Sequence, residues 1–119
     1  MSNSVMLEKS KEFAVAIVKL CKTVSETNRE YVLTNQLIRA GTSIGANIHE
    51  SKYGHGTADF IAKMQIALKE CYESEYWLDL LFKTEYISEA QYKEMKNACG
   101  GLRRMLISSI NTVKGHNGL

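Results

Sequence analysis

The chain contains no proline, and this absence constrains its fold. Proline breaks helix interiors and presets turns, so a chain without it favours long helices with short connections over a loop-rich or all-β fold. Cysteine is scarce too: Cys21, Cys71 and Cys99 show no Cys-x-x-Cys spacing, which excludes the usual zinc-site and disulfide patterns. All three stand at apolar helical positions, so we expect buried free thiols and a reducing, cytoplasmic setting.

The chain also lacks a strong excess of either charge and any long apolar run. Its 119 residues include 15 Lys and Arg against 13 Asp and Glu, a formal net charge of +2. A balance this close permits a nucleic-acid partner without requiring one. No apolar run approaches the ~18 residues of a membrane-spanning helix, and no basic segment followed by an apolar run marks a signal peptide. We therefore expect one cytoplasmic globular domain with no membrane partner.

Apolar residues recur at steps of three and four in four segments, which is the pattern of amphipathic helices. We predict helices over about residues 5–25, 29–53, 57–83 and 88–114 of a single domain, residues 1–119. Short links make neighbouring helices antiparallel, so the predicted fold class is all-α, an antiparallel up-down-up-down four-helix bundle. The expected core positions are Phe13, Ile17, Leu20, Val24, Leu33, Leu37, Ala40, Ile44, Ile48, Phe60, Met64, Ala67, Leu68, Cys71, Leu78, Phe82, Tyr92, Met95, Cys99, Leu102, Leu106, Ile110 and Val113.

Local signals indicate where the helices begin. Asn28 is a suitable N-cap for the second helix and Thr57 for the third. Two glycines in the run Tyr53-Gly54-His55-Gly56 permit a sharp turn between these helices. Ser88, with Gln91 three residues later, predicts a capping box at the start of the fourth helix.

The second predicted helix is unusual in residues 37–51, which are rich in Gly, Ala, Ser, Thr and Asn. Because these residues have mostly poor helix propensity, the stretch favours close approach to a neighbour, with Gly41, Gly45 and Ala46 letting two backbones come together. A polar row follows the same helix at helical steps: Arg39, Ser43, Asn47 and Glu50. The pattern predicts a specialised contact face and indicates no particular chemistry.

The third predicted helix has more apolar residues than one core stripe needs, including Trp77 and Leu81 beside Ile66 and Leu80. Two interpretations remain open. These side chains either widen the core face or meet another subunit, since apolar patches rimmed with charge commonly mark protein contacts and Trp and Arg are favoured anchors there. On the second interpretation, the predicted interface of a homo-oligomer comprises Arg39, Ser43, Asn47, Glu50, Trp77 and Leu81.

Arg39 needs a carboxylate partner on either interpretation, inside the chain or across an interface. The candidates are Glu50, Glu70 and Glu73. Glu75, in the middle of the third core stripe, likewise needs a partner or access to solvent.

No motif for catalysis, a cofactor or a metal emerges from the sequence. Di-iron bundles use Glu-x-x-His, which is absent, and buried cysteines are poor nucleophiles. The glycines form no phosphate-binding loop after a strand, and we expect Gly100-Gly101 to mark a close helix crossing or a local bend. We therefore expect no enzymatic activity, no cofactor and no metal.

A basic row on the fourth helix is the remaining candidate site. It consists of Lys93, Lys96, Arg103, Arg104 and Lys114. These side chains either form an ordinary solvated face or contact nucleic-acid phosphates, which Arg and Lys neutralise without reading sequence. An oligomer would multiply a weak patch of this kind through avidity.

Several runs together resemble a known bacterial family. They are Gln36-Leu-Ile-Arg39-Ala-Gly-Thr-Ser43-Ile-Gly-Ala-Asn47-Ile-His-Glu50, the segment from Asp59 to Glu70, Glu75-Tyr-Trp-Leu78 and Glu85-Tyr-Ile-Ser88. The chain is similar to four-helix-bundle proteins first noticed in intervening sequences of 23S ribosomal RNA genes, a family that includes the accessory variability determinant of diversity-generating retroelements. His49, Ser51 and Glu85 depart from the family pattern around the helix ends.

The resemblance implies an antiparallel four-helix bundle and a ring-shaped homopentamer. It places Arg39, Ser43, Asn47 and Glu50 in the family's second-helix motif. The retroelement member acts with reverse transcriptase and nucleic acid, whereas most members have no established activity. We expect a non-enzymatic, oligomeric binding or scaffold module that contacts RNA, DNA or a nucleic-acid-processing protein. The alternative is a purely structural or protein-interaction homo-oligomer without nucleic-acid contact, and a small enzyme or metal protein is the third possibility.

Overall fold

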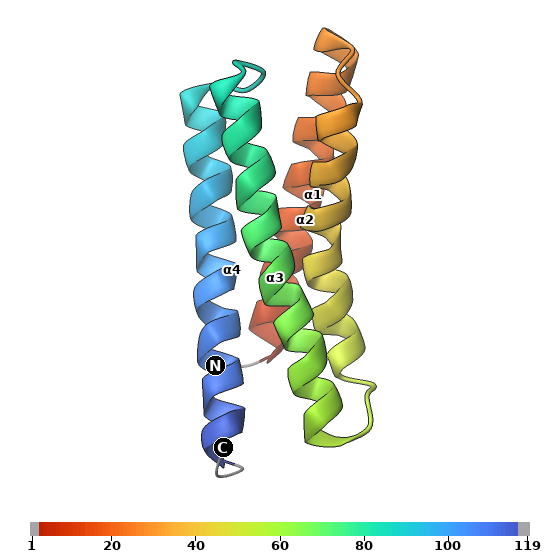
Figure 1. Cartoon of the computed structure of the whole chain (residues 1–119), viewed down its shortest axis with the longest axis vertical. Helices are drawn as coiled ribbons and strands as arrows, with labels where there is room; N and C mark the ends of the chain where they lie inside the picture. Colours follow the sequence, from red (N-terminus) through yellow and green to blue (C-terminus); the bar gives the residue numbers. More distant parts are fainter. Residues whose placement is uncertain (1–2, 117–119) are drawn as a thin grey trace.

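Four α-helices form the part of the chain that the computed structural model describes, residues 3–116 (Figure 1). Their bounds are α1 Asn3–Asn28, α2 Val32–Ser51, α3 Gly56–Lys83 and α4 Glu89–His116. The α1–α2 and α3–α4 links lie at one end of the molecule, and the α2–α3 link lies at the other (Figure 1). No strand occurs among residues 3–116. The predicted all-α, four-helix fold is confirmed.

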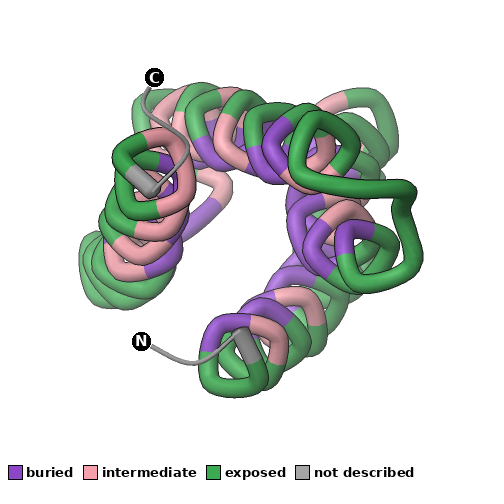
Figure 2. Tube along the Cα trace, turned by 90° about the horizontal axis from the view of Figure 1, so that it is seen from below, coloured by how far each residue is buried: buried purple, intermediate pink, exposed green. Residues whose placement is uncertain are grey.

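Each helix contacts two neighbours around a shared core. Helix α1 packs against α2 and α4, and α3 packs against the same two helices. Seen along the bundle, the buried segments of the four helices face one another (Figure 2). The principal extents of 49 × 22 × 20 Å reflect the length of the helices. Polar side chains meet at the surface along two of these helix contacts, which we call the α2/α3 seam and the α3/α4 seam.

The predicted core stripes are largely confirmed by burial. Fully buried positions occur on every helix, as at Ile17, Ile44, Met64 and Leu106. The three cysteines are free and have no exposed surface, as predicted. The stripe positions that remain half-buried are Leu33, Phe60, Leu68, Phe82, Tyr92 and Val113.

Two of the predicted helix starts are wrong. Helix α1 extends through Asn28, so this residue does not cap α2. The Glu30 carboxylate does so by accepting hydrogen bonds from the backbone N–H groups of Leu33 (3.0 Å) and Thr34 (3.1 Å). An extra turn of α1 therefore displaced the predicted boundary, and an acidic side chain two residues before α2 supplies the cap.

Helix α3 begins at a glycine with a positive φ angle, and helix α4 begins with a capping box. Helix α3 starts at Gly56, whose φ of +83° suits glycine, so Thr57 lies inside the helix and does not cap it. The Asp59 carboxylate instead accepts the His55 N–H at 2.9 Å. At α4 the predicted box is confirmed, because the Gln91 N–H donates to the Ser88 hydroxyl (3.1 Å) and the Ser88 N–H donates to the Gln91 side chain (2.8 Å).

The glycines of α2 bring it close to α1. A Cβ atom added at Gly41 would lie 3.1 Å from the Ile17 side chain, and one added at Gly45 would lie 2.9 Å from Ser10 Oγ. The predicted close approach is therefore found, but inside the bundle, where these two positions are buried. Another subunit cannot be the neighbour that these glycines accommodate.

The predicted close crossing at Gly100-Gly101 is not found in the described chain. An added Cβ at either position would meet only the ends of Arg103 and Arg104, at 3.3–4.0 Å. Helix α4 continues through both glycines. The two glycines thus lie beneath flexible cationic side chains rather than beneath a second helix.

Candidate functional site

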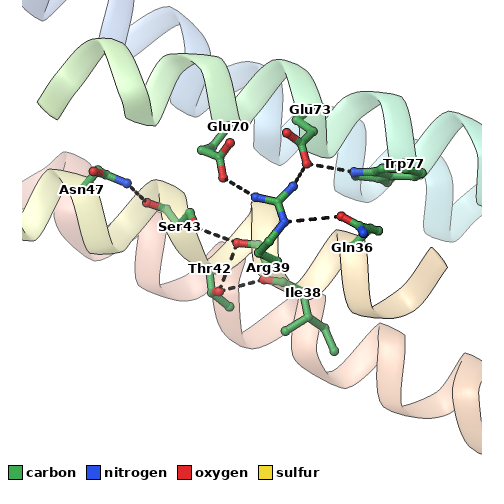
Figure 3. Close-up of polar contacts among 9 residues, drawn as sticks. All are labelled: Gln36, Ile38, Arg39, Thr42, Ser43, Asn47, Glu70, Glu73 and Trp77. Atoms are coloured by element: carbon green, nitrogen blue, oxygen red, sulfur yellow. Dashed lines mark hydrogen bonds and ion pairs between the residues drawn. The ribbon is translucent and has the colours of Figure 1, made fainter. Parts of the chain in front are cut away.

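The α2/α3 seam is organised around Arg39. Its guanidinium group donates to Glu70 at 3.1 Å, forms an ion pair with Glu73 and lies 3.4 Å from the Gln36 side-chain oxygen (Figure 3). Glu70 is 7% exposed, so its carboxylate has little contact with water and pairs with Arg39 instead. Trp77 Nε1 donates to Glu73 at 3.1 Å and extends the cluster along α3. Two of the three candidate carboxylates for Arg39 are thus its partners, and both belong to the same chain.

The polar row of α2 is satisfied largely by its own helix. The Ser43 hydroxyl donates to the Arg39 carbonyl oxygen at 2.7 Å, and the Asn47 side chain donates to the Ser43 carbonyl oxygen at 2.8 Å (Figure 3). Glu50, the third candidate carboxylate, pairs instead with Lys63 of α3 at 2.9 Å. The row therefore lies along one edge of α2, beside α3, with its side-chain geometry already fixed.

The predicted interface residues do not all reach the surface. Trp77 is half-buried beside the α2/α3 seam, whereas Leu81 has no exposed surface and belongs to the core. For Leu81 the structure thus selects the first of the two open interpretations, a widened core face. Apolar side chains still lie open near this seam, notably Val32 (73% exposed) and Ile66 (44% exposed).

The α3/α4 seam holds a second set of ion pairs. Glu75 accepts a hydrogen bond from Arg103 Nε at 3.0 Å and lies 3.8 Å from Lys96 Nζ. Lys96 also donates to Asp79 at 3.0 Å, and the Tyr92 hydroxyl donates to the same carboxylate at 2.6 Å. Glu75 therefore has the partner that its place in the core stripe requires.

These contacts shift the pKa values of the groups involved. Partial burial raises the pKa of Asp79, but hydrogen bonds from Tyr92 and Lys96 outweigh it and hold that pKa below its usual value. The bond to Asp79 raises the pKa of Tyr92, and the bond to Glu75 raises the pKa of Arg103. The seam thus favours an ionised carboxylate and protonated partners.

The lowered pKa of Asp79 predicts acid sensitivity with a definite sign. A carboxylate with a lowered pKa stabilises the fold above its unfolded pKa of about 3.9, and this contribution is lost as the pH falls through the lower folded value. In urea unfolding between pH 6 and pH 3, Asp79→Asn should be less stable than wild type at pH 6 and approach it at pH 3. Glu8→Gln, at an exposed position, is the control. A pH-independent gap between Asp79→Asn and wild type would contradict the prediction.

The basic row of α4 is partly neutralised by neighbouring acids. Lys93 pairs with Glu89 at 2.8 Å, and Lys96 and Arg103 take part in the α3/α4 seam. Arg104 is exposed and Lys114 is half-buried, and neither forms an ion pair within residues 3–116. The structure therefore does not present the five cations as one open phosphate-binding surface.

The thiols are the strongest potential nucleophiles, and all three are buried. Burial raises the pKa of Cys21 to about 12. The pKa of Cys71 is also raised, by a hydrogen bond with Cys99 and by burial. In the described chain, no group of three or more His, Cys, Asp or Glu side chains could hold a metal ion. Across residues 3–116 the helices are also too polar or too short to cross a membrane.

Two features of the α3/α4 surface were missed in the sequence. The central carbon of the Arg103 guanidinium group lies 5.8 Å from the centre of the Tyr72 ring, and Tyr72 is 53% exposed. Tyr76, one turn further along α3, is 55% exposed. The sequence shows that the two tyrosines are four residues apart. Which arginine lies beside them depends on how α3 and α4 align. Gly100 was noticed for its backbone, whereas the structure places it beneath the two arginines.

Comparisons with known proteins agree with the resemblance drawn from the sequence. The sequence matches, over residues 2–108, the family described as 23S rRNA-intervening sequence protein. It is also similar to a crystal structure of a protein of unknown function from the S23 ribosomal protein family of Bacteroides thetaiotaomicron VPI-5482. The two share 48% sequence identity and a TM-score of 0.91, with 93% of this chain and 99% of that chain covered. No curated protein matches the sequence. This chain is therefore a member of the 23S rRNA-intervening sequence protein family.

Proposed function

We propose that this protein is a non-catalytic binding module that works as a homo-oligomer in the cytoplasm. The observation that carries the proposal is the surface beside the α2/α3 seam, where an ordered polar cluster borders the exposed side chains of Val32 and Ile66. Exposed apolar side chains beside ordered polar groups are common at protein contacts. Arg39, Ser43, Asn47, Glu50 and Trp77 form the polar part of this subunit contact.

The assembly that we propose is a ring of five antiparallel bundles, as the family resemblance implies. A heterologous contact of one surface with a different one closes into a ring when the rotation between copies allows it. The suppressed thiols support binding over covalent catalysis, and free buried cysteines suit a reducing compartment.

Nucleic acid is the partner that we propose for the assembled module. Support comes from cations without an ion-pair partner in residues 3–116, such as exposed Arg104, together with exposed tyrosines on the adjacent helix. A purely structural homo-oligomer remains the competing function, and the nearly balanced net charge of +2 favours it.

Ile66→Arg tests the subunit contact. The new cation stands one helical turn before Glu70 and on the exposed side of α3, so we expect a folded protein whose native mass falls to that of the monomer. The measurement is light scattering coupled to size exclusion, with circular dichroism to verify folding. Val15→Arg, at a 53% exposed position of α1, is the matched control. A wild-type monomer, or an Ile66→Arg variant of unchanged mass, would refute the proposed contact.

A further inference from the structure

Two guanidinium groups converge above Gly100 on the α3/α4 side of the bundle. The point where a Gly100 Cβ would stand lies 3.3 Å from Arg104 Nη1 and 3.4 Å from Arg103 Nη2. Both arginines therefore bring their terminal nitrogens to one place. Arg103 and Arg104 follow Gly100 by three and four residues, and helical side chains lean toward the N-terminus, so both side chains lie over the glycine.

The charges at this point are not balanced among the described residues. Arg103 uses Nε to bond Glu75, while Arg104 has no ion-pair partner among the described residues. Lys96 is 3.8 Å from Glu75 and 3.0 Å from Asp79, so the two carboxylates pair with Arg103 and Lys96, and Arg104 is the cation left over. Like charges held close together repel, and an anion placed between them relieves the repulsion. Arginine pairs suit phosphate because each guanidinium offers several donors in one plane.

Gly100 makes room for the two guanidinium groups that would bind such an anion. Glycine in a helix interior lowers helix stability, yet α4 carries two in succession, and an added Cβ at Gly100 would meet only the two arginine side chains. Gly100 is buried, and its missing side chain lets the two guanidinium groups lie directly against the helix backbone. The contact with the two arginines explains why a glycine stands at position 100.

An aromatic platform adjoins the two arginines. The Arg103 guanidinium lies over the Tyr72 ring at 5.8 Å, and exposed Tyr76 follows one turn later on α3. Exposed aromatic rings beside cations are typical of surfaces that bind single-stranded nucleic acid, since bases stack on the rings while cations hold the backbone. Bases inside a duplex are not available for such stacking.

We propose that Arg103 and Arg104 hold a phosphate of single-stranded RNA above Gly100, with a neighbouring base stacked on the exposed part of Tyr72 that Arg103 does not cover. This inference rests on the proposed nucleic-acid function and names the strand type, the anchoring pair and the stacking residue. It also replaces the five-residue row on α4 with a compact site shared by α3 and α4.

The test measures binding of a fluorescent single-stranded oligouridine by anisotropy at several salt concentrations. Gly100→Ala fills the space below the guanidinium groups while improving helix propensity, so the fold is kept and affinity should fall about tenfold. Arg104→Gln should also weaken binding about tenfold and reduce the salt slope by about one. Tyr72→Ala should cost about tenfold, and Tyr72→Phe should retain binding.

Matched controls separate this site from general effects. Gly115→Ala adds a methyl group to α4 where nothing lies within 4 Å, and Lys11→Gln removes an exposed cation from α1. Both should bind as wild type does. Duplex RNA should bind more weakly than the single strand, and inorganic phosphate at matched ionic strength should compete weakly because it lacks the base.

The possible failures are distinguishable. If wild-type protein does not bind the oligonucleotide, the proposed nucleic-acid function fails and this inference fails with it. If wild type binds but Gly100→Ala and Arg104→Gln bind equally well, the site is wrong while the wider function stands. If phosphate competes as strongly as the oligonucleotide and Tyr72→Ala has no effect, the site is one for free phosphate, and the assignment to RNA is overturned.

Discussion

Gly45→Ala should lower the free energy of unfolding by about 2 kcal/mol, although alanine is the better helix former. The added Cβ would lie 2.9 Å from Ser10 Oγ and 3.4 Å from Ser10 Cβ, closer than packed atoms tolerate. Ser10 has no exposed surface, and its hydroxyl donates to the Leu7 carbonyl oxygen at 2.6 Å, so it has little freedom to move. Helices α1 and α2 would have to separate, and the core between them would lose contact. Urea unfolding monitored by circular dichroism measures the effect.

A second substitution shows whether this contact is the cause. Ser10→Ala removes the oxygen and leaves its Cβ at a nearly ordinary packing distance, so Gly45→Ala in that background should cost less than about 0.5 kcal/mol. Gly115→Ala, with nothing near its added methyl group, should be neutral or slightly stabilising. Equal costs for Gly45→Ala in both backgrounds would mean that Ser10 does not limit the approach of the two helices.

The helices and most of the core were predictable because they depend on periodicity within one segment. Positions such as Ile44 and Cys99 recur at helical steps and are buried as expected. The start of α2 was not predictable in this way. Its cap comes from Glu30, a residue type that is not a favoured N-cap, after α1 continues further than its apolar pattern indicates.

The contacts of the candidate site could not be predicted from the sequence, because they depend on which helices pack together. Composition alone indicated that Gly41 and Gly45 permit a close approach, but not that the neighbour is α1 of the same chain. Sequence likewise indicated that Glu75 needs a partner, whereas its bond to Arg103 depends on the alignment of α3 with α4. Contacts between residues far apart in the chain are set by three-dimensional packing, and one helix's spacing does not encode them.

Leu81→Ala should cost about 3 kcal/mol of unfolding free energy and leave the native mass unchanged. Leu81 has no exposed surface and packs among the core side chains, so truncation leaves a cavity inside the bundle. The adjacent residue provides a matched comparison, because Leu80 is half-buried on the same helix. Leu80→Ala should cost less than about 1 kcal/mol, since water can reach the truncated site.

The pair of leucines thus separates a core role from an interface role. If Leu81 served mainly at a subunit contact, Leu81→Ala would lower the native mass in light scattering while sparing the stability of the monomer. If it is a core residue, the variant unfolds at lower urea concentration and still elutes at the wild-type mass until it unfolds. Both readouts come from the same protein samples. A loss of mass without a loss of stability would return Leu81 to the interface and require a bundle packed differently from this one.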